Sequence, residues 1–329
     1  MALIEVEDLS VELPIAGELR PVLREVSFSI DAGESLALVG ESGAGKSMTA
    51  RAIARLLPDG ARTDGTARVG GEDMLALRGA QLRTARSRMA VIFQDPRAHI
   101  NPVRRVGDFM TEQLRAVKGV ARAQASQRAV AALASVGISD GRRRLSQFPH
   151  ELSGGLLQRV MIATALLAEP QVILADEPTT ALDVTTQSEV MAILDELRRE
   201  LELALLFITH DLDLAAAVCD ETAVMYAGQI VERQRSGSLH ELPLHPYTAA
   251  LTAARPDIGA AGVTRLAAIP GRPIASWQAG RGCAFAPRCP YRQDICTERQ
   301  PQLRDLAEGA VRCVRAEELR GALTEVAHG

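Results

Sequence analysis

The segment from Gly40 to Ser47 has the composition of a phosphate-binding loop. It reads Gly-Glu-Ser-Gly-Ala-Gly-Lys-Ser and fits the pattern G-x-x-x-x-G-K-S/T. Glycines let the backbone curl until successive N–H groups and the start of the next helix converge on phosphate oxygens, and a lysine adds positive charge at the β- and γ-phosphates. The Ser47 hydroxyl suits Mg²⁺. The expected phosphate-binding residues are Gly40, Glu41, Ser42, Gly43, Ala44, Gly45, Lys46 and Ser47.

Two adjacent carboxylates, Asp176 and Glu177, close an apolar run and predict hydrolysis of the bound nucleotide. Asp176 can hold the magnesium shell while Glu177 reaches a water in line with the γ-phosphate, which is the positioning that phosphoryl transfer needs. Gln94 closes another apolar run and is expected to contact both the magnesium and the water. His210 closes a third and is expected to donate to the γ-phosphate.

These polar residues require a sheet whose strands deliver them to one edge. Four runs are too uniformly apolar for half-exposed strands and predict a mostly parallel core sheet covered on both faces: 35–39, 89–93, 172–175 and 205–208. The segments 3–13 and 22–30 alternate polar and apolar residues and predict an antiparallel side sheet. The fold class is therefore α/β, a nucleoside triphosphatase built around the phosphate loop.

Composition changes along the chain suggest its domains. Residues 1–250 are expected to form the nucleotide-binding domain, with an inserted helical subdomain at about 100–165 that is rich in Ala, Arg, Gln and Leu. Within it, the Arg142 to Arg144 run is expected to be a solvated loop. Residues 251–329 are rich in proline and carry four of the five cysteines, which predicts a small C-terminal module.

Bulk composition excludes several other classes of protein. The 329 residues carry 37 Lys and Arg against 41 Asp and Glu, a net charge of −4, with 3% aromatic residues. This balance argues against a nucleic-acid partner held by a basic face or by stacked bases. The longest apolar runs fall well short of the roughly 18 to 20 residues that cross a bilayer, and the first ten residues lack the pattern of a secretory signal. We therefore expect a protein of the cytosol.

The chain resembles the ATP-binding subunits of ABC transporters, because it carries their signature segment Leu152-Ser153-Gly154-Gly155. The phosphate loop, Gln94, this signature, the paired carboxylates, Asp183 and His210 follow in the family's order. The resemblance implies ATP as ligand and an ATPase activity coupled to transport. It also implies that Ser153, Gly154 and Gly155 bind the γ-phosphate held by a second ATPase subunit, so that one chain cannot complete a site.

Further segments resemble the oligopeptide and dipeptide importer subfamily: 92–96, 101–102, 148–152, 175–184, 225–228, 245–248 and the cysteine-bearing tail. That resemblance implies two transmembrane permeases, a second and commonly non-identical ATPase chain, an extracytoplasmic substrate-binding protein, and a place on the cytoplasmic face of the cell membrane. Two alternatives stay open: an importer of nickel or metallophores, and a soluble ABC ATPase that acts on nucleic acid or the ribosome.

The cysteines Cys283, Cys289, Cys296 and Cys313 are separated by five, six and sixteen residues. Clustering in a reducing compartment points to metal before disulfides. The tight pairs usual for zinc are absent from this sequence, and four thiolates can hold an iron–sulfur cluster. The resemblance implies a 4Fe-4S cluster, while zinc and unligated thiols stay open.

Overall fold

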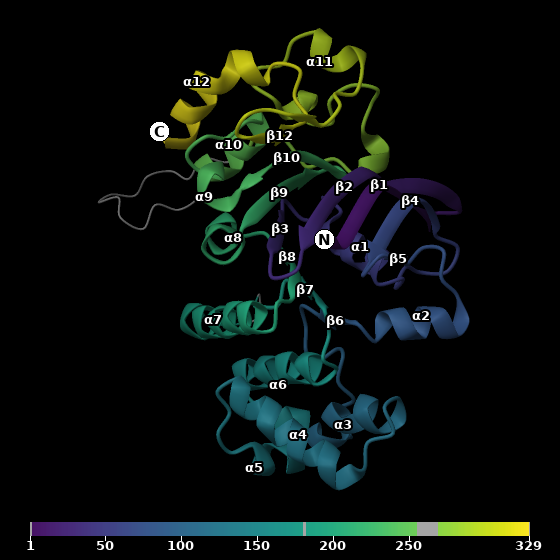
Figure 1. Ribbon diagram of the computed structural model, residues 1–329. Coiled ribbons are helices and arrows are strands. Elements are labelled where there is room, and N and C mark those ends of the chain that lie inside the picture. The colour runs from purple at the N-terminus through teal and green to yellow at the C-terminus, as the bar shows by residue number, and fades with distance from the viewer. Residues whose placement is uncertain (1, 180–181, 255–268, 329) are drawn as a thin grey trace. The chain divides into compact units, whose positions relative to one another are not determined.

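The computed structural model describes residues 2–179, 182–254 and 269–328 (Figure 1). The chain forms two compact units. The first contains residues 1–4, 29–34 and 68–208, and the second contains 5–28, 35–67 and 209–329. The Ala175 to Val184 segment includes residues 180 and 181, and the predicted C-terminal module includes 255–268 and 329, which lie outside the described residues.

Parallel strands form the core of the first unit. Strand β7 (Val172–Asp176) lies between β6 (Met89–Ile92) and β8 (Ala204–Thr209), parallel to both. Every residue of β7 and β8 is buried, as expected for strands covered on both faces. The strands predicted from these apolar runs are confirmed, and the register places Asp176 beside Ile208 at the carboxyl end.

The second unit has its own group of strands. Strand β3 (Ser35–Val39), also fully buried, runs parallel to β9 (Glu221–Tyr226), and β9 turns through Ala227 and Gly228 into antiparallel β10 (Gln229–Arg235). Both turn residues have positive φ, of 47° and 79°, which suits a tight hairpin. The C-terminal strands β12 (Gly309–Val311) and β11 (Arg304–Asp305) extend this group antiparallel from β10.

A separate four-stranded sheet has the order β2-β1-β4-β5. It is built from β1 (Ala2–Ile15), β2 (Glu18–Asp31), β4 (Arg62–Val69) and β5 (Glu72–Asp73). The first two strands alternate between buried and more exposed residues along much of their length, because one face of the sheet is covered and the other is not. The predicted side sheet is confirmed, and with it the α/β fold class.

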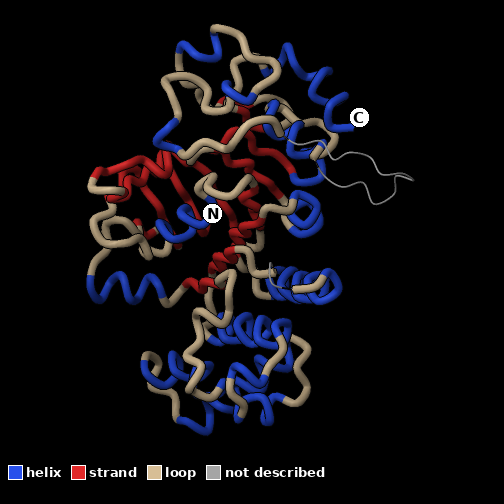
Figure 2. The backbone as a smooth tube through the Cα atoms, turned by 180° about the vertical axis from the view of Figure 1, so that it is seen from behind, coloured by secondary structure: helices blue, strands red, loops and turns tan. Residues whose placement is uncertain are grey.

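The first unit also contains a group of helices with no strand among the described residues 100–165 (Figure 2). Its members are α3 (Val106–Ala116), α4 (Arg122–Ser135), α5 (Gly141–Ser146) and α6 (Gly154–Leu167). The expectation that the run from Arg142 to Arg144 is a loop is wrong, because this run lies in α5. Asp140, which precedes α5, pairs with Arg143 and Arg144 at 3.0 and 2.9 Å and stabilises the helix start.

The remaining elements connect or cover these sheets. They are α1 (Lys46–Ile53), α2 (Gly79–Arg86), η1 (Pro149–Glu151), α7 (Val184–Glu200), α8 (Leu212–Val218), α9 (Ser236–Leu239), α10 (Pro246–Ala253), η2 (Ser276–Gln278), η3 (Ala286–Arg288), α11 (Ile295–Glu298) and α12 (Ala316–His328). Among the described residues, no helix combines the length and the apolar character needed to cross a membrane.

Candidate nucleotide site

The phosphate loop joins β3 to α1 and depends on two glycines. Gly45 caps α1 with φ of 110°, a conformation that side chains rarely adopt, and a Cβ there would lie 2.7 Å from Leu23 Cδ2. A Cβ on Gly40 would lie 2.3 Å from the carbonyl oxygen of Met225. The sequence pattern is therefore required by close packing under the loop as well as by its curl.

Lys46 and the start of α1 give the loop its positive character. The Lys46 side chain is 6% exposed, and its Nζ donates to the carbonyl oxygens of Gly40 at 2.7 Å and Glu41 at 3.2 Å. The turn between β9 and β10 is hydrogen-bonded to the phosphate loop, because the Gly228 N–H donates to Ala44 O at 2.8 Å. Converging N–H groups, a helix start and an ammonium group make an anion site.

The paired carboxylates lie at the end of β7, as expected. Asp176 is 7% exposed, and Glu177 follows with a left-handed φ of 46°. The Glu177 N–H donates to Ile208 O at 2.9 Å, and its Oε2 accepts a 3.0 Å hydrogen bond from Gln94 Nε2. A non-glycine residue in this conformation stores strain, which proteins concentrate at functional sites. The structure thus brings Gln94 and Glu177 together, and the left-handed backbone has no signal in the sequence.

The signature segment begins α6 and contacts α7. Ser153 caps α6 and its Oγ accepts from the N–H of Leu156 at 3.4 Å. A Cβ on Gly155 would lie 2.5 Å from Thr186 Cγ2, while the Thr186 hydroxyl and N–H donate to Asp183 at 2.7 and 3.0 Å. These two hydrogen bonds lower the pKa of Asp183 and keep it ionised at the start of α7. Sequence reasoning missed Thr186, which joins the signature to Asp183.

A cavity of about 310 Å³ in the first unit brings two predicted site residues together. Gln94 and Gly154 both line it, with Gln158 and Leu182. In the second unit, Ser47 is half-buried in the first turn of α1, and Ser42 and Gly43 are exposed at the loop tip. His210 directly follows β8 and is exposed, and the next residue, Asp211, caps α8.

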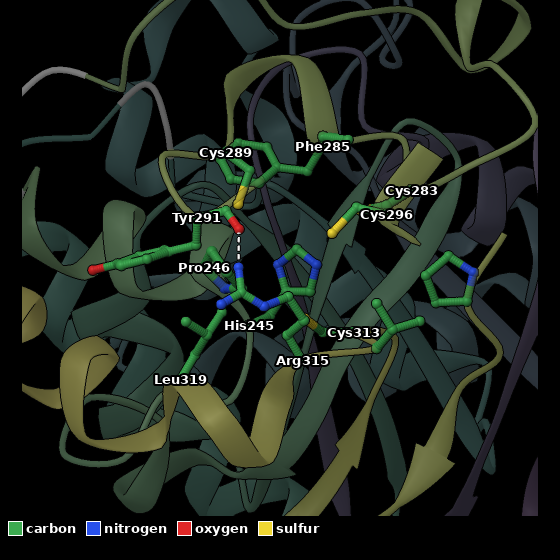
Figure 3. Close-up of a pocket in the computed structure, with 13 residues that line it drawn as sticks. His245, Pro246, Cys283, Phe285, Cys289, Tyr291, Cys296, Cys313, Arg315 and Leu319 are labelled. Atoms are coloured by element: carbon green, nitrogen blue, oxygen red, sulfur yellow. Dashed lines mark hydrogen bonds between the residues drawn. The ribbon is translucent and has the colours of Figure 1, made fainter. Parts of the chain in front are cut away.

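The four clustered cysteines line one small pocket in the second unit (Figure 3). The pocket leaves about 20 Å³, room for one water, beside His245. Burial raises the pKa of Cys283 to about 12 and that of Cys313 to about 11, so both are neutral thiols near pH 7. No group of three or more Cys, His, Asp or Glu side chains within the described part of the chain is arranged to hold a metal ion. The expected iron–sulfur cluster is therefore not supported, although all four cysteines line the same pocket.

His245 was not anticipated as a member of this pocket. Its ring is 1% exposed, and its Nδ1 accepts the N–H of Tyr247 at 3.0 Å, which leaves the proton on Nε2. Burial lowers the pKa of His245 to about 3, so the ring is neutral. Among the described residues, Nε2 has no hydrogen-bond partner.

Comparison with known proteins agrees with this arrangement. The ABC transporter profile matches residues 23–180, and the profile of the oligopeptide/dipeptide transporter C-terminal region matches 231–296. The oligopeptide transport ATP-binding protein OppD of Salmonella typhimurium is 42% identical over 91% of this chain and 89% of its own length. OppD of Bacillus subtilis is 42% identical over 92% of this chain and 85% of its own length.

Solved structures agree on the fold. A dimeric bacterial ABC transporter cassette, MJ0796, superposes with a TM-score of 0.63 at 25% identity, over 71% of this chain and 98% of that one. The structure of cbiO1 from Clostridium perfringens superposes with a TM-score of 0.62 at 26% identity, over 72% of this chain and 90% of that one. With the phosphate loop, the strand-end carboxylates and the signature helix in place, these likenesses show that the chain belongs to the ABC transporter ATP-binding proteins, in the oligopeptide transport group.

Proposed function

We propose that this chain binds ATP on the loop from Gly40 to Ser47 and hydrolyses it with Glu177 as general base. The observation that carries the proposal is the 3.0 Å hydrogen bond from Gln94 to Glu177, since it holds a carboxylate in a fixed direction at the end of a buried strand. Glu177 takes a proton from the attacking water, while Lys46 offsets charge on the phosphates. His210 is assigned to the γ-phosphate, as the family resemblance implies.

The proposed magnesium ligands are Ser47, Gln94 and Asp176. Hydroxyl, amide and carboxylate oxygens are the hard donors that Mg²⁺ prefers, so these side chains fit the ion. Gln94 uses its amide nitrogen on Glu177, which leaves its amide oxygen for the metal. When bound, Mg²⁺ neutralises charge on the phosphate oxygens.

We assign the signature residues Ser153, Gly154 and Gly155, with Asp183, to the nucleotide of a second ATPase subunit. The N-terminal turn of α6, which begins at Gly154 after the Ser153 cap, favours an anion. ATP then joins two subunits and its hydrolysis releases them, which biases a conformational equilibrium as a ligand of one state does. The second subunit is proposed to be a non-identical chain.

The transport role follows the relatives. Several curated relatives are described as oligopeptide transport or peptide import ATP-binding proteins, which favours peptides as cargo. Two permeases, an extracytoplasmic binding protein and a peripheral place on the cytoplasmic face of the membrane complete the proposal. Isolating the membrane complex and identifying the ligand of its binding protein tests the substrate class, and a nickel or metallophore ligand would replace peptides.

Glu177→Gln tests the proposed activity. It is expected to keep Mg-ATP affinity within a few-fold and to lower turnover by about 10²- to 10⁴-fold, because loss of a general base removes a contribution of that order. Glu196→Gln is the matched control, since Glu196 is an exposed carboxylate on α7. Turnover is measured in the complex with its permeases in lipid vesicles. Near-normal ATP hydrolysis by Glu177→Gln would refute the assignment of Glu177 as the general base.

The domain division at residue 250 stays a prediction, and the state of the four cysteines is open to a direct test. Four thiols from residues 283–313 line one buried space, but no three of the Cys, His, Asp or Glu side chains in the described part of the chain are arranged to hold a metal ion, which favours unligated thiols. Zinc and iron with sulfide are separated by elemental analysis and visible absorbance of protein purified without air. Protein with neither metal is the expected result, and either metal would contradict unligated thiols.

A further inference from the structure

Arg288 reaches from the cysteine-bearing loop to the phosphate loop. It directly precedes Cys289, and its side chain is 4% exposed. Its two terminal nitrogens donate to the two carboxylate oxygens of Glu41 at 2.6 and 3.2 Å, while its Nε donates to Pro270 O at 2.9 Å. Planar two-point pairing of this kind fixes direction as well as charge.

The backbone of Glu41 is held from the same side. Its N–H donates to the Tyr247 hydroxyl at 2.9 Å, and Tyr247 is fully buried. The Phe285 ring packs against Tyr247 and Tyr226 with centroids 5.2 and 5.4 Å apart. Both the side chain and the backbone N–H of Glu41, the second residue of the phosphate loop, are therefore hydrogen-bonded to residues that follow β10 in the chain.

The charge on Glu41 makes this contact matter for nucleotide binding. A carboxylate inside a phosphate loop repels a polyphosphate, and the repulsion is strong where water is scarce. Glu41 is about one-quarter exposed, so solvent alone screens it incompletely. Arg288 neutralises the carboxylate and holds it against the C-terminal residues.

We propose that Arg288 is a positioning residue for ATP binding: its pairing with Glu41 neutralises and orients the phosphate loop, so the C-terminal region contributes to the nucleotide site. The proposal rests on the proposed ATP-binding function. Arg288 acts through Glu41 and takes no part in the chemistry at Glu177. Its loss therefore weakens binding of Mg-ATP and raises KM, while turnover at saturating ATP stays within about twofold.

The test is a double-mutant cycle in the full-length chain, read out as Mg-ATP affinity by calorimetry, with KM and kcat measured in the assembled complex. Arg288→Gln is expected to weaken affinity about tenfold, because it leaves a bare carboxylate in the loop. Glu41→Gln removes that carboxylate and also leaves Arg288 without its partner, so it is the second single variant from which the coupling between the two residues is calculated. The double variant is expected to recover most of the affinity lost by Arg288→Gln, since the repelling charge is gone.

Two further variants separate positioning from general stability. Arg288→Lys keeps the charge without the fork and is expected to recover part of the affinity. Arg320→Gln breaks an outer ion pair with Glu308, at 2.8 Å in the same region, and is expected to change nothing. Thermal unfolding without nucleotide confirms that each variant is folded.

The proposal is overturned if Arg288→Gln binds Mg-ATP like wild type, or if the double variant binds no more tightly than Arg288→Gln. A fall in kcat with unchanged KM would also overturn it. Failure of the wild-type chain itself to bind Mg-ATP would instead refute the proposed function, so the two failures are distinguishable.

Discussion

Replacing Gly155 with alanine tests how the signature segment is held. The new Cβ would lie 2.5 Å from Thr186 Cγ2, well inside van der Waals contact. Thr186 cannot simply rotate away, because its hydroxyl donates to Asp183 at 2.7 Å and its N–H donates to the same carboxylate at 3.0 Å. Either this pair of bonds breaks or α6 moves away from α7.

The expected cost follows from two opposing effects. Adding a methyl group to a packed contact destabilises by about 1–3 kcal/mol. Alanine regains up to about 1 kcal/mol over glycine in a helix, and less in its first turn. We therefore expect Gly155→Ala to lower the free energy of unfolding by about 1–2 kcal/mol and to lower ATP turnover, because the segment from Ser153 to Gly155 moves.

The second substitution Thr186→Ser is expected to restore both properties. Serine lacks the obstructing methyl group and keeps the hydroxyl that donates to Asp183. Gly321→Ala is the matched control, since nothing lies within 4 Å of a Cβ at Gly321 in α12, and it is expected to be neutral or stabilising. Urea unfolding followed by circular dichroism measures the change as a shift of midpoint at constant slope. Wild-type stability of Gly155→Ala, or no recovery with Thr186→Ser, would refute the reasoning.

Two other predictions concern groups buried in the second unit. Burial raises the pKa of Glu232 to about 7 from 4.5, although the N–H groups of Leu244 and His245 donate to it at 3.0 and 2.7 Å. As pH rises, the unfolded chain therefore loses this proton before the folded chain does. The free energy of unfolding of the wild type is expected to fall by up to about 3 kcal/mol between pH 4.5 and 7 relative to that of Glu232→Gln. Urea titrations across that range measure the difference, and parallel pH profiles of the two proteins would contradict the prediction. Burial also raises the pKa of Cys283 and Cys313 and keeps both thiols neutral, so iodoacetamide at pH 7 is expected to label them much more slowly in the native chain than in urea. Mass spectrometry measures the labelling, and equal rates in the two conditions would show that the thiols are accessible.

The chemistry-bearing segments could be predicted because each is continuous in the chain. The phosphate loop needs only eight consecutive residues between a strand and a helix, and its glycines record the backbone it must adopt. Asp176 and Glu177 end an apolar run, so their place at the edge of a parallel sheet follows from local pattern. The signature follows in the same way from four residues at the start of α6.

The cysteines mark the limit of such reasoning. Their clustering in the sequence pointed to a metal site, and the structure brings all four to one pocket without arranging three of them, within the described residues, to hold a metal ion. Spacing alone could not give the room between them or place His245 beside them, because both depend on how distant backbone segments pack. The helix across Arg142 to Arg144 likewise depends on pairing with Asp140, which composition does not reveal.

The sequence by itself determined the phosphate loop, the carboxylate pair and the signature, because local backbone geometry and a few neighbouring side chains suffice to specify each of them. Only the tertiary structure decided that Glu41 pairs with Arg288, 247 positions away, and that Thr186 links Gly155 to Asp183. Such contacts are set by the three-dimensional packing of strands and helices, whose partners are not ordered by distance along the chain.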